Sequence, residues 1–278
     1  MFLFTDLKDY TKYFEEYKLN QLLNVDLSAY GELTEKVSRT SLTDTVEHFA
    51  TGYENGFDAE LDDLIRLHFL VISRKVSTIL EIGTGKSTII FDNALEINKK
   101  RHYEYYKENV RCSNLFECHT IDDDDDWIRS FISKNKTKNT TFYHSIANVS
   151  LFNERICTLF EKLPNICPDL IYIDGPAQFS PQGEIRGIHT RQLDRLPMSA
   201  DILAIEHFLL PGTLIVLDGR TANARFLQAN FQRNWNHYYV EKYDQHFFEL
   251  AEKPLGLINK DKIDYCLGED FYKRIKEL

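Results

Sequence analysis

From residue 76 onward, short apolar runs alternate with stretches of helical periodicity, and this alternation constrains the fold more than any other feature of the sequence. The runs are rich in β-branched residues and lie at 76–82, 115–121, 141–146, 169–174 and 213–218. Several of them are apolar without strict alternation, which is expected of strands that are covered on both faces. Because these strands alternate with helices, the pattern predicts an α/β fold with a parallel, doubly wound sheet.

Two further segments extend this pattern. Residues 237–243 and 246–250 are separated by a short turn and predict an antiparallel hairpin after the parallel strands. Between the third and fourth apolar runs, helical spacing predicts a helix with Ser150 as its N-cap. The apolar residues that show this spacing are Phe152, Ile156, Leu159, Phe160 and Leu163.

The first 70 residues have a helical pattern instead. Apolar side chains recur at i, i+3, i+4 and i+7 in two places, first at Tyr10, Tyr13, Phe14 and Tyr17 and then at Leu61, Leu64, Ile65, Phe69 and Ile72. A loop rich in turn residues, 51–56, lies between them. We therefore predict an N-terminal helical extension or lid over residues 1–70, followed by an α/β domain over residues 71–278.

Composition limits the class of ligand. The chain is 43% hydrophobic and 27% charged, as globular proteins are, and its net charge of −10 disfavours nucleic acid, whose binding depends on cationic contacts to phosphates. The longest apolar stretch, 67–73, is far shorter than the roughly 20 residues that span a bilayer. The five cysteines show no CxxC spacing, and residues 1–6 do not resemble a signal peptide. We expect a cytoplasmic protein with a small-molecule substrate, no nucleic acid and no membrane partner.

A glycine-rich turn follows the first predicted strand and is the most informative motif. It contains an acid, two glycines and a serine at alternating positions: Glu81, Gly83, Gly85 and Ser87. Glycine permits a tight turn with close approach of a ligand, and the following helix offers free N–H groups to an anion. A P-loop would need glycine at Leu80 and is excluded, while Thr88 in the third glycine position disfavours a dinucleotide site. A structural turn that binds no ligand stays open.

Residues 76–87 resemble the first motif of class I S-adenosylmethionine-dependent methyltransferases. Residues 168–175 are similar to the fourth-strand motif of that family, and residues 210–218 to its Pro-Gly-Gly turn and fifth strand, with Thr213 in place of the second glycine. The resemblance extends over roughly residues 70 to 250. It implies a Rossmann-like, mostly parallel seven-stranded sheet with a terminal antiparallel hairpin, and S-adenosylmethionine as the cofactor.

The resemblance also implies cofactor-binding residues. Those expected around the methionyl half of the cofactor are Glu81, Gly83, Gly85 and Ser87. The acid that ends the second strand would bind both ribose hydroxyls, since a carboxylate accepts from two adjacent donors. Asp122 is the first candidate and Asp123 the second, and the acids after them, up to Asp126, are interpreted as a solvated loop. Asn148 falls where the adenine is usually held, and a long helical stretch at 91–110 separates the glycine turn from these acids.

Methyl transfer from a sulfonium is an in-line displacement that requires an aligned nucleophile and removal of its proton. Asp174 and Asp218 end the fourth and fifth predicted strands, at the carboxyl edge where open α/β sheets bind ligands, so both are catalytic candidates. Asp174 could equally cap a helix or contact the cofactor. In one branch of the family, acids near these positions hold a divalent cation. Gly219 and Arg220 stand where that branch carries a second acid or Asn, so Mg²⁺ is possible but disfavoured and no metal ligands are predicted.

The connection at 175–197 is long, and loops beyond about 12–15 residues without regular structure are often active-site lids. His189 lies within it and is a candidate general base, because imidazole titrates near pH 6.5 or so; the other interpretation is a surface histidine. Arg186, Arg191 and Arg220 could bind an acidic substrate through bidentate contacts or form ordinary surface ion pairs.

The sequence thus predicts an S-adenosylmethionine-dependent methyltransferase that acts on a hydroxyl of a small-molecule or sugar-like acceptor. Two alternatives stay open. A methyltransferase-like binding module without catalysis would fit Thr213 and the absence of a recognisable substrate motif. An NAD-dependent or nucleotide-sugar enzyme would use a similar sheet. A homodimer is also possible, since helices outside such sheets often dimerise.

Overall fold

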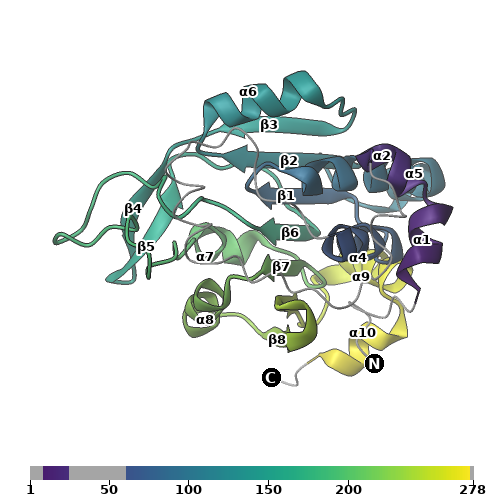
Figure 1. Ribbon diagram of the computed structural model, residues 1–278. Helices are drawn as coiled ribbons and strands as arrows, with labels where there is room; N and C mark the ends of the chain where they lie inside the picture. Colours follow the sequence, from purple (N-terminus) through teal and green to yellow (C-terminus); the bar gives the residue numbers. More distant parts are fainter. Residues whose placement is uncertain (1–8, 25–60, 276–278) are drawn as a thin grey trace.

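The computed structural model describes residues 9–24 and 61–275, and the loop predicted at 51–56 lies outside these residues. Within them, the chain forms a seven-stranded sheet with helices on both faces (Figure 1). The strands are β1 (Thr78–Ile82), β2 (Glu117–Asp122), β3 (Thr140–His144), β6 (Leu170–Ile173), β7 (Leu214–Asp218), β8 (Trp235–Val240) and β9 (Gln245–Leu250). Their order across the sheet is β3-β2-β1-β6-β7-β9-β8.

Five of these strands, β3, β2, β1, β6 and β7, are parallel, while β9 is antiparallel to both of its neighbours, β7 and β8. The chain builds outward from β1 through β2 to β3, then crosses back to place β6 on the other side of β1. The direction of building therefore changes between β1 and β6, which is the place where open α/β sheets bind ligands. The predicted parallel strands and terminal antiparallel hairpin are confirmed.

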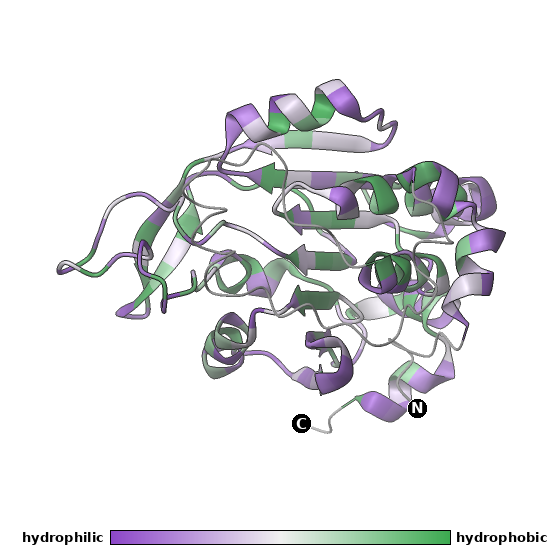
Figure 2. Ribbon diagram, in the orientation of Figure 1, coloured by the Kyte–Doolittle hydropathy of each residue, from purple (hydrophilic) through white to green (hydrophobic). Residues whose placement is uncertain are grey.

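Side chains alternate between two apolar cores, one on each face of the sheet. Ile79 of β1 faces one cluster and Leu80 the other. Figure 2 shows β6 and β7 in the green of apolar residues. Burial of each Leu or Ile side chain stabilises the fold by about 1.5–3 kcal/mol.

The first core lies under α4 (Leu61–Ser73) and α5 (Lys86–Asn109), and α1 (Tyr10–Glu16) and α2 (Leu19–Leu23) pack against the same cluster. The helices predicted from the spacing of Tyr10 and Leu61 with their neighbours are confirmed as α1 and α4. The predicted division at residue 70 falls inside α4, and its assignment as a domain boundary stays a prediction. In Figure 1, α1 and α2 lie at the opposite end of the molecule from β4 and β5.

The second core is covered by α7 (Asp201–Ile205), η2 (Glu206–Phe208), α8 (Thr221–Asn230) and a separate two-stranded sheet. The strands of that sheet, β4 (Ala147–Phe152) and β5 (Arg155–Phe160), are antiparallel. The helix predicted here with Ser150 as its N-cap is wrong. Asn153 and Glu154 adopt φ angles of 47° and 63°, and two consecutive positive φ angles match the tight type I′ turn of a β-hairpin.

Residues 175–199 cover both free edges of this hairpin. Gln182 forms a parallel bridge with Asn148 of β4, and Ser199 forms one with Thr158 of β5. The edges of the small sheet are thereby paired within the chain. We call β4, β5 and residues 175–199 together the hairpin unit.

The remaining elements flank the main sheet: α6 (Asp125–Lys134) beside β3, η3 (Glu241–Tyr243) between β8 and β9, and α9 (Gly256–Cys266) and α10 (Glu269–Arg274) after β9. Buried ion pairs hold α10. Glu249 of β9 is fully buried and lies 3.1 Å from Arg74, directly after α4, and 2.7 Å from Arg274 of α10. None of the helices in the described part of the chain combines the length and the apolar composition that a bilayer crossing requires.

Candidate functional site

Two glycines lie back to back where the sheet changes direction. Gly83 follows β1 with a φ of +101°, and a Cβ built on it would lie 3.0 Å from the backbone nitrogen of Gly175, which follows β6. A Cβ on Gly175 would lie 2.9 Å from the nitrogen of Gly83. Since real Cβ atoms do not tolerate such distances, only glycine fits at both positions. This contact brings the predicted cofactor turn next to Asp174.

Glu81 is a buried carboxyl group that ties β1 to the start of α5. Its two oxygens accept hydrogen bonds of 2.6 Å from the hydroxyls of Ser87 and Thr88. Burial raises the pKa of Glu81 to about 8, and the hydrogen bonds from Ser87 and Thr88 act in the opposite direction. The structure therefore brings Glu81 and Ser87 together, while their contact with a cofactor stays a prediction.

Asp122 ends β2 and faces the glycine turn. Its carboxylate accepts a 2.7 Å hydrogen bond from the Thr84 backbone and one of 3.1 Å from the Asp124 backbone. Burial raises the pKa of Asp122 to about 7, against these two hydrogen bonds. A carboxylate has about four acceptor positions, so about two remain available for a pair of hydroxyls. The backbone thus fixes the orientation of Asp122, the predicted ribose-binding acid, and leaves part of its carboxylate free to accept further hydrogen bonds.

Asp123 connects the same strand end to the hairpin unit. Burial raises the pKa of Asp123, while the nearby Ser180 side chain lowers it. The Ser180 hydroxyl donates its hydrogen bond to the Ala177 carbonyl at 3.0 Å. Ser180 belongs to the long connection after β6, so part of this connection lies beside the end of β2. Sequence reasoning missed Ser180, because nothing in the local pattern indicates which residue of a long loop returns to the sheet.

Trp127 is a second residue that sequence reasoning missed. Its indole nitrogen donates a 2.6 Å hydrogen bond to the Thr84 carbonyl in the glycine turn. The prediction that the acids before it form a solvated loop is wrong. Asp124 caps α6, because its side chain accepts a 2.8 Å hydrogen bond from the Trp127 backbone N–H. Asp125 and Asp126 lie in the first turn of the helix. Carboxylates at a helix N-terminus are stabilised by its free N–H groups. The run of aspartates is the signal that could have indicated this helix start.

Asp174 and Asp218 end the neighbouring strands β6 and β7. Arg220 pairs with the first of these acids: its Nε lies 3.6 Å from Asp174, and its Nη1 donates to the Pro176 carbonyl at 3.3 Å. The surrounding protein raises the pKa of Asp174 and Arg220 lowers it; because the side chain is 57% exposed, water screens both effects. Of the two interpretations of Arg220, substrate binding and an ordinary ion pair, the structure shows an ion pair with Asp174.

His189 lies in the hairpin unit. Its Nδ1 atom is buried without a hydrogen-bond partner, and the same is true of the neighbouring Thr190 hydroxyl. The arginines around it bind backbone carbonyls: Arg191 donates to Pro181 at 3.3 Å and Arg195 to His189 at 3.0 Å. Arg191 therefore helps to hold the connection in place.

Asn148 lies in β4, opposite Leu159 of β5, and its side-chain amide donates to Glu161 at 3.2 Å. The structure thus places the predicted adenine contact inside the hairpin unit. Among the residues described, no three side chains of His, Cys, Asp or Glu are grouped so that they could hold a metal ion.

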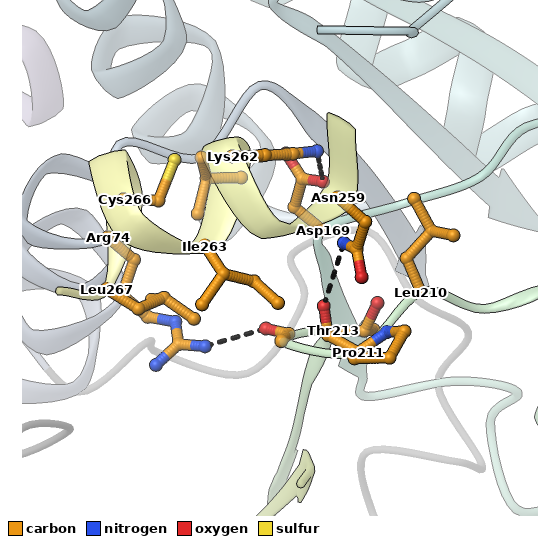
Figure 3. Close-up of a pocket in the computed structure, with 12 residues that line it drawn as sticks. Arg74, Asp169, Leu210, Pro211, Thr213, Asn259, Lys262, Ile263, Cys266 and Leu267 are labelled. Atoms are coloured by element: carbon orange, nitrogen blue, oxygen red, sulfur yellow. Dashed lines mark hydrogen bonds and ion pairs between the residues drawn. The ribbon is translucent and has the colours of Figure 1, made fainter. Parts of the chain in front are cut away.

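A small cavity lies at the opposite, amino edge of the sheet (Figure 3). Its lining includes Arg74, Asp169, Thr213 and Lys262, and Lys262 forms an ion pair with Asp169. Its volume is about 30 Å³, and a water needs roughly 10–15 Å³ by this measure. The cavity has room for one or two waters and is far too small for a nucleoside.

The strand order, the reversed β9 and the glycine turn at the switch point make this a Rossmann-like fold, as the resemblance to class I S-adenosylmethionine-dependent methyltransferases implies. No protein-family model matches the chain, and a search of curated proteins finds no match. Among solved structures, the chain is similar to the C-terminal domain of precorrin-6Y C5,15-methyltransferase from Rhodobacter capsulatus, with 10% identity and a TM-score of 0.35. That match covers 72% of this chain and 93% of the other.

Proposed function

We propose that the chain is a methyltransferase that transfers a methyl group from S-adenosylmethionine to a hydroxyl of a small-molecule acceptor. The observation that carries the proposal is the position of Asp122. The Thr84 backbone orients this carboxylate beside the Gly83 turn, at the point where the sheet changes direction. An oriented acid beside a glycine turn suits a ribose diol attached to a group that must approach the backbone closely.

The charge and the small size of the residues at this edge of the sheet support S-adenosylmethionine as the cofactor. S-adenosylmethionine, when bound, supplies a methyl group on a positively charged sulfonium. Asp122 would accept from the ribose hydroxyls, and Gly83 and Gly85 would leave room along the turn. Asp174, exposed at the end of β6, would place a negative charge at the same edge of the sheet.

The acceptor hydroxyl must lose its proton as the new carbon–oxygen bond forms and the carbon–sulfur bond breaks. We assign the removal of this proton to the imidazole of His189, whose Nδ1 has no partner within the chain. A neutral imidazole nitrogen that accepts no hydrogen bond can take up the proton of the acceptor hydroxyl.

Calorimetric titration tests the proposal with S-adenosylmethionine, S-adenosylhomocysteine and NAD⁺. We expect both sulfur ligands to bind, NAD⁺ not to bind, and Asp122→Asn to weaken both sulfur ligands at least tenfold. Asp261→Asn, which changes an exposed acid of α9, serves as the matched control and should bind as the unchanged chain does. Absence of any heat with S-adenosylmethionine, or tighter binding of NAD⁺, would contradict the proposal.

One contact favours a second function, a cofactor-binding module without catalysis. Arg220 pairs with Asp174 and thereby reduces the negative charge available at the end of β6. This function predicts cofactor binding without methyl transfer to any hydroxyl compound, both in the unchanged chain and in Arg220→Gln. Methyl transfer by the unchanged chain would exclude it.

A further inference from the structure

The hairpin unit is attached to the strand ends that carry the candidate cofactor acids. It begins after β3, where the Ser145 backbone donates to the Asp122 carbonyl at 3.0 Å, and it resumes at Gly175, directly after β6. Ser180, in this connection, lies near enough to Asp123 to lower the pKa of that carboxyl group. In Figure 1, β4 and β5 project beyond the ends of β1, β2 and β6. The unit therefore borders the site at which the proposed function places the cofactor.

The unit exposes large apolar side chains. The four that are exposed, with their exposed fractions, are Leu151 (48%), Ile188 (37%), Leu193 (52%) and Leu196 (40%). Three of them, Ile188, Leu193 and Leu196, belong to the connection after β6, whose backbone is held by the bridges of Gln182 and Ser199 to the hairpin. Exposed apolar side chains that gather in one part of a surface are typical of a binding site, and the bridges hold the backbone that carries these residues.

Buried polar atoms without partners gather in the same unit. Five buried side-chain nitrogen or oxygen atoms of the described residues lack a hydrogen bond, and three of them belong to Thr158, His189 and Thr190. Thr158 and Thr190 are only 1% and 7% exposed. A buried hydroxyl without a partner costs free energy, which a hydrogen bond from a bound molecule would recover.

We infer that the hairpin unit binds the methyl acceptor, and that the acceptor is a hydroxyl compound with an apolar body rather than a sugar. The inference rests on the proposed function and gives it a substrate class. The exposed leucines would cover the apolar body, while His189 and Thr190 would pair with its hydroxyl. A sugar, in contrast, would leave most of its hydroxyls facing leucine and isoleucine side chains without partners.

The test uses the full chain saturated with S-adenosylhomocysteine and titrated with 2-naphthol or with methyl glucoside. We expect 2-naphthol to bind and methyl glucoside not to bind. The double variant Leu193→Asp with Leu196→Asp should weaken 2-naphthol at least tenfold. Leu257→Asp is the matched control, because Leu257 is a leucine of α9 that is 77% exposed outside the unit.

Thr190→Val tests the hydroxyl separately, since valine has nearly the shape of threonine. We expect it to weaken 2-naphthol at least threefold and to leave S-adenosylhomocysteine binding unchanged. In methyl transfer from S-adenosylmethionine to 2-naphthol, the same variants should raise the KM for 2-naphthol.

The inference is overturned if 2-naphthol does not bind, if methyl glucoside binds more tightly, or if the leucine pair has no more effect than Leu257→Asp. A Thr190→Val chain that changes only its melting temperature would overturn the assignment of this hydroxyl to the acceptor. Failure of the proposed function would give a different result from failure of this inference. If the proposed function is wrong, S-adenosylhomocysteine itself does not bind to the unchanged chain.

Discussion

The indole nitrogen of Trp127 donates a 2.6 Å hydrogen bond to the carbonyl of Thr84, and so ties α6 to the glycine turn after β1. Thr84 also donates its backbone N–H to Asp122. The turn is therefore held from both sides by groups that belong to β2 and α6. Any ligand seated on the turn is in contact with residues whose positions depend on Trp127.

Trp127→Phe removes the indole N–H and should weaken S-adenosylmethionine about fivefold, since one net hydrogen bond contributes about 1 kcal/mol. The unchanged chain should also show a change of tryptophan fluorescence when the cofactor binds. The chain has two tryptophans, and Trp235 is buried in the second core. Trp235→Phe should therefore keep the fluorescence response and Trp127→Phe should lose it. The opposite pattern would separate Trp127 from the cofactor.

The affinity for the cofactor should increase with pH because Asp122 binds hydroxyl donors best when ionised. Burial raises the pKa of Asp122 to about 7, so roughly one molecule in ten is ionised at pH 6 and nine in ten at pH 8. Calorimetric titrations across this range should show affinity rising about tenfold. S-adenosylhomocysteine shares the ribose and should show the same rise, and Asp122→Asn should abolish it for both ligands. A rise confined to S-adenosylmethionine would point to its sulfonium charge instead.

Glu81 should make the folded chain less stable as the pH rises. Burial raises the pKa of Glu81 to about 8, well above the value of about 4.3 for an unfolded chain. Between these pH values the folded state holds a proton that the unfolded state has released. The free energy of unfolding should therefore fall with increasing pH, by at most about 1.4 kcal/mol per pH unit.

Glu81→Gln removes this titration and should make the fall in the free energy of unfolding between pH 5 and pH 8 smaller, with Asp261→Asn as the control. The raised pKa of Asp122 should keep part of that fall in place. The amide keeps a donor and an acceptor for Ser87 and Thr88. An unchanged slope in Glu81→Gln would show that Glu81 is ionised in the folded chain throughout this range.

The turn of the small hairpin offers a test of the fold itself. Glu154 has a φ of 63°, where a residue with a Cβ is destabilised by about 1–2 kcal/mol relative to glycine. Glu154→Gly should raise the free energy of unfolding by up to about 1 kcal/mol, and the β-branched Glu154→Val should lower it. Equal stability of the two variants in urea unfolding would argue against a type I′ turn at this position.

Much of the main sheet could be predicted because its strands are short apolar runs flanked by helices. The long spacing between Gly83 and Asp122 is explained by α5, a single helix of 24 residues. The hairpin of β4 and β5 could not be predicted, because Phe152, Ile156 and Leu159 happen to repeat at helical spacing. Its turn at Asn153 and Glu154 also lacks the glycine that usually marks such turns.

The candidate site was predictable only where a residue ends a strand. Asp122, Asp174 and Asp218 follow apolar runs, and parallel strands carry their ends to one edge. The contacts of Trp127 and Ser180 depend instead on how α6 and the connection after β6 fold back, which short-range patterns do not encode. The roles of all these residues in binding and catalysis stay predictions.

The position of β9 has a consequence for how the chain is made. β9 is synthesised after β8, yet it lies between β7 and β8 in the sheet. On the ribosome, β8 therefore emerges before the strand that attaches it, and the edge of β7 stays open until residue 250 has left the exit tunnel. A premature stop within residues 241–245 would yield an unfinished sheet whose exposed edge invites pairing with other chains, rather than a smaller protein.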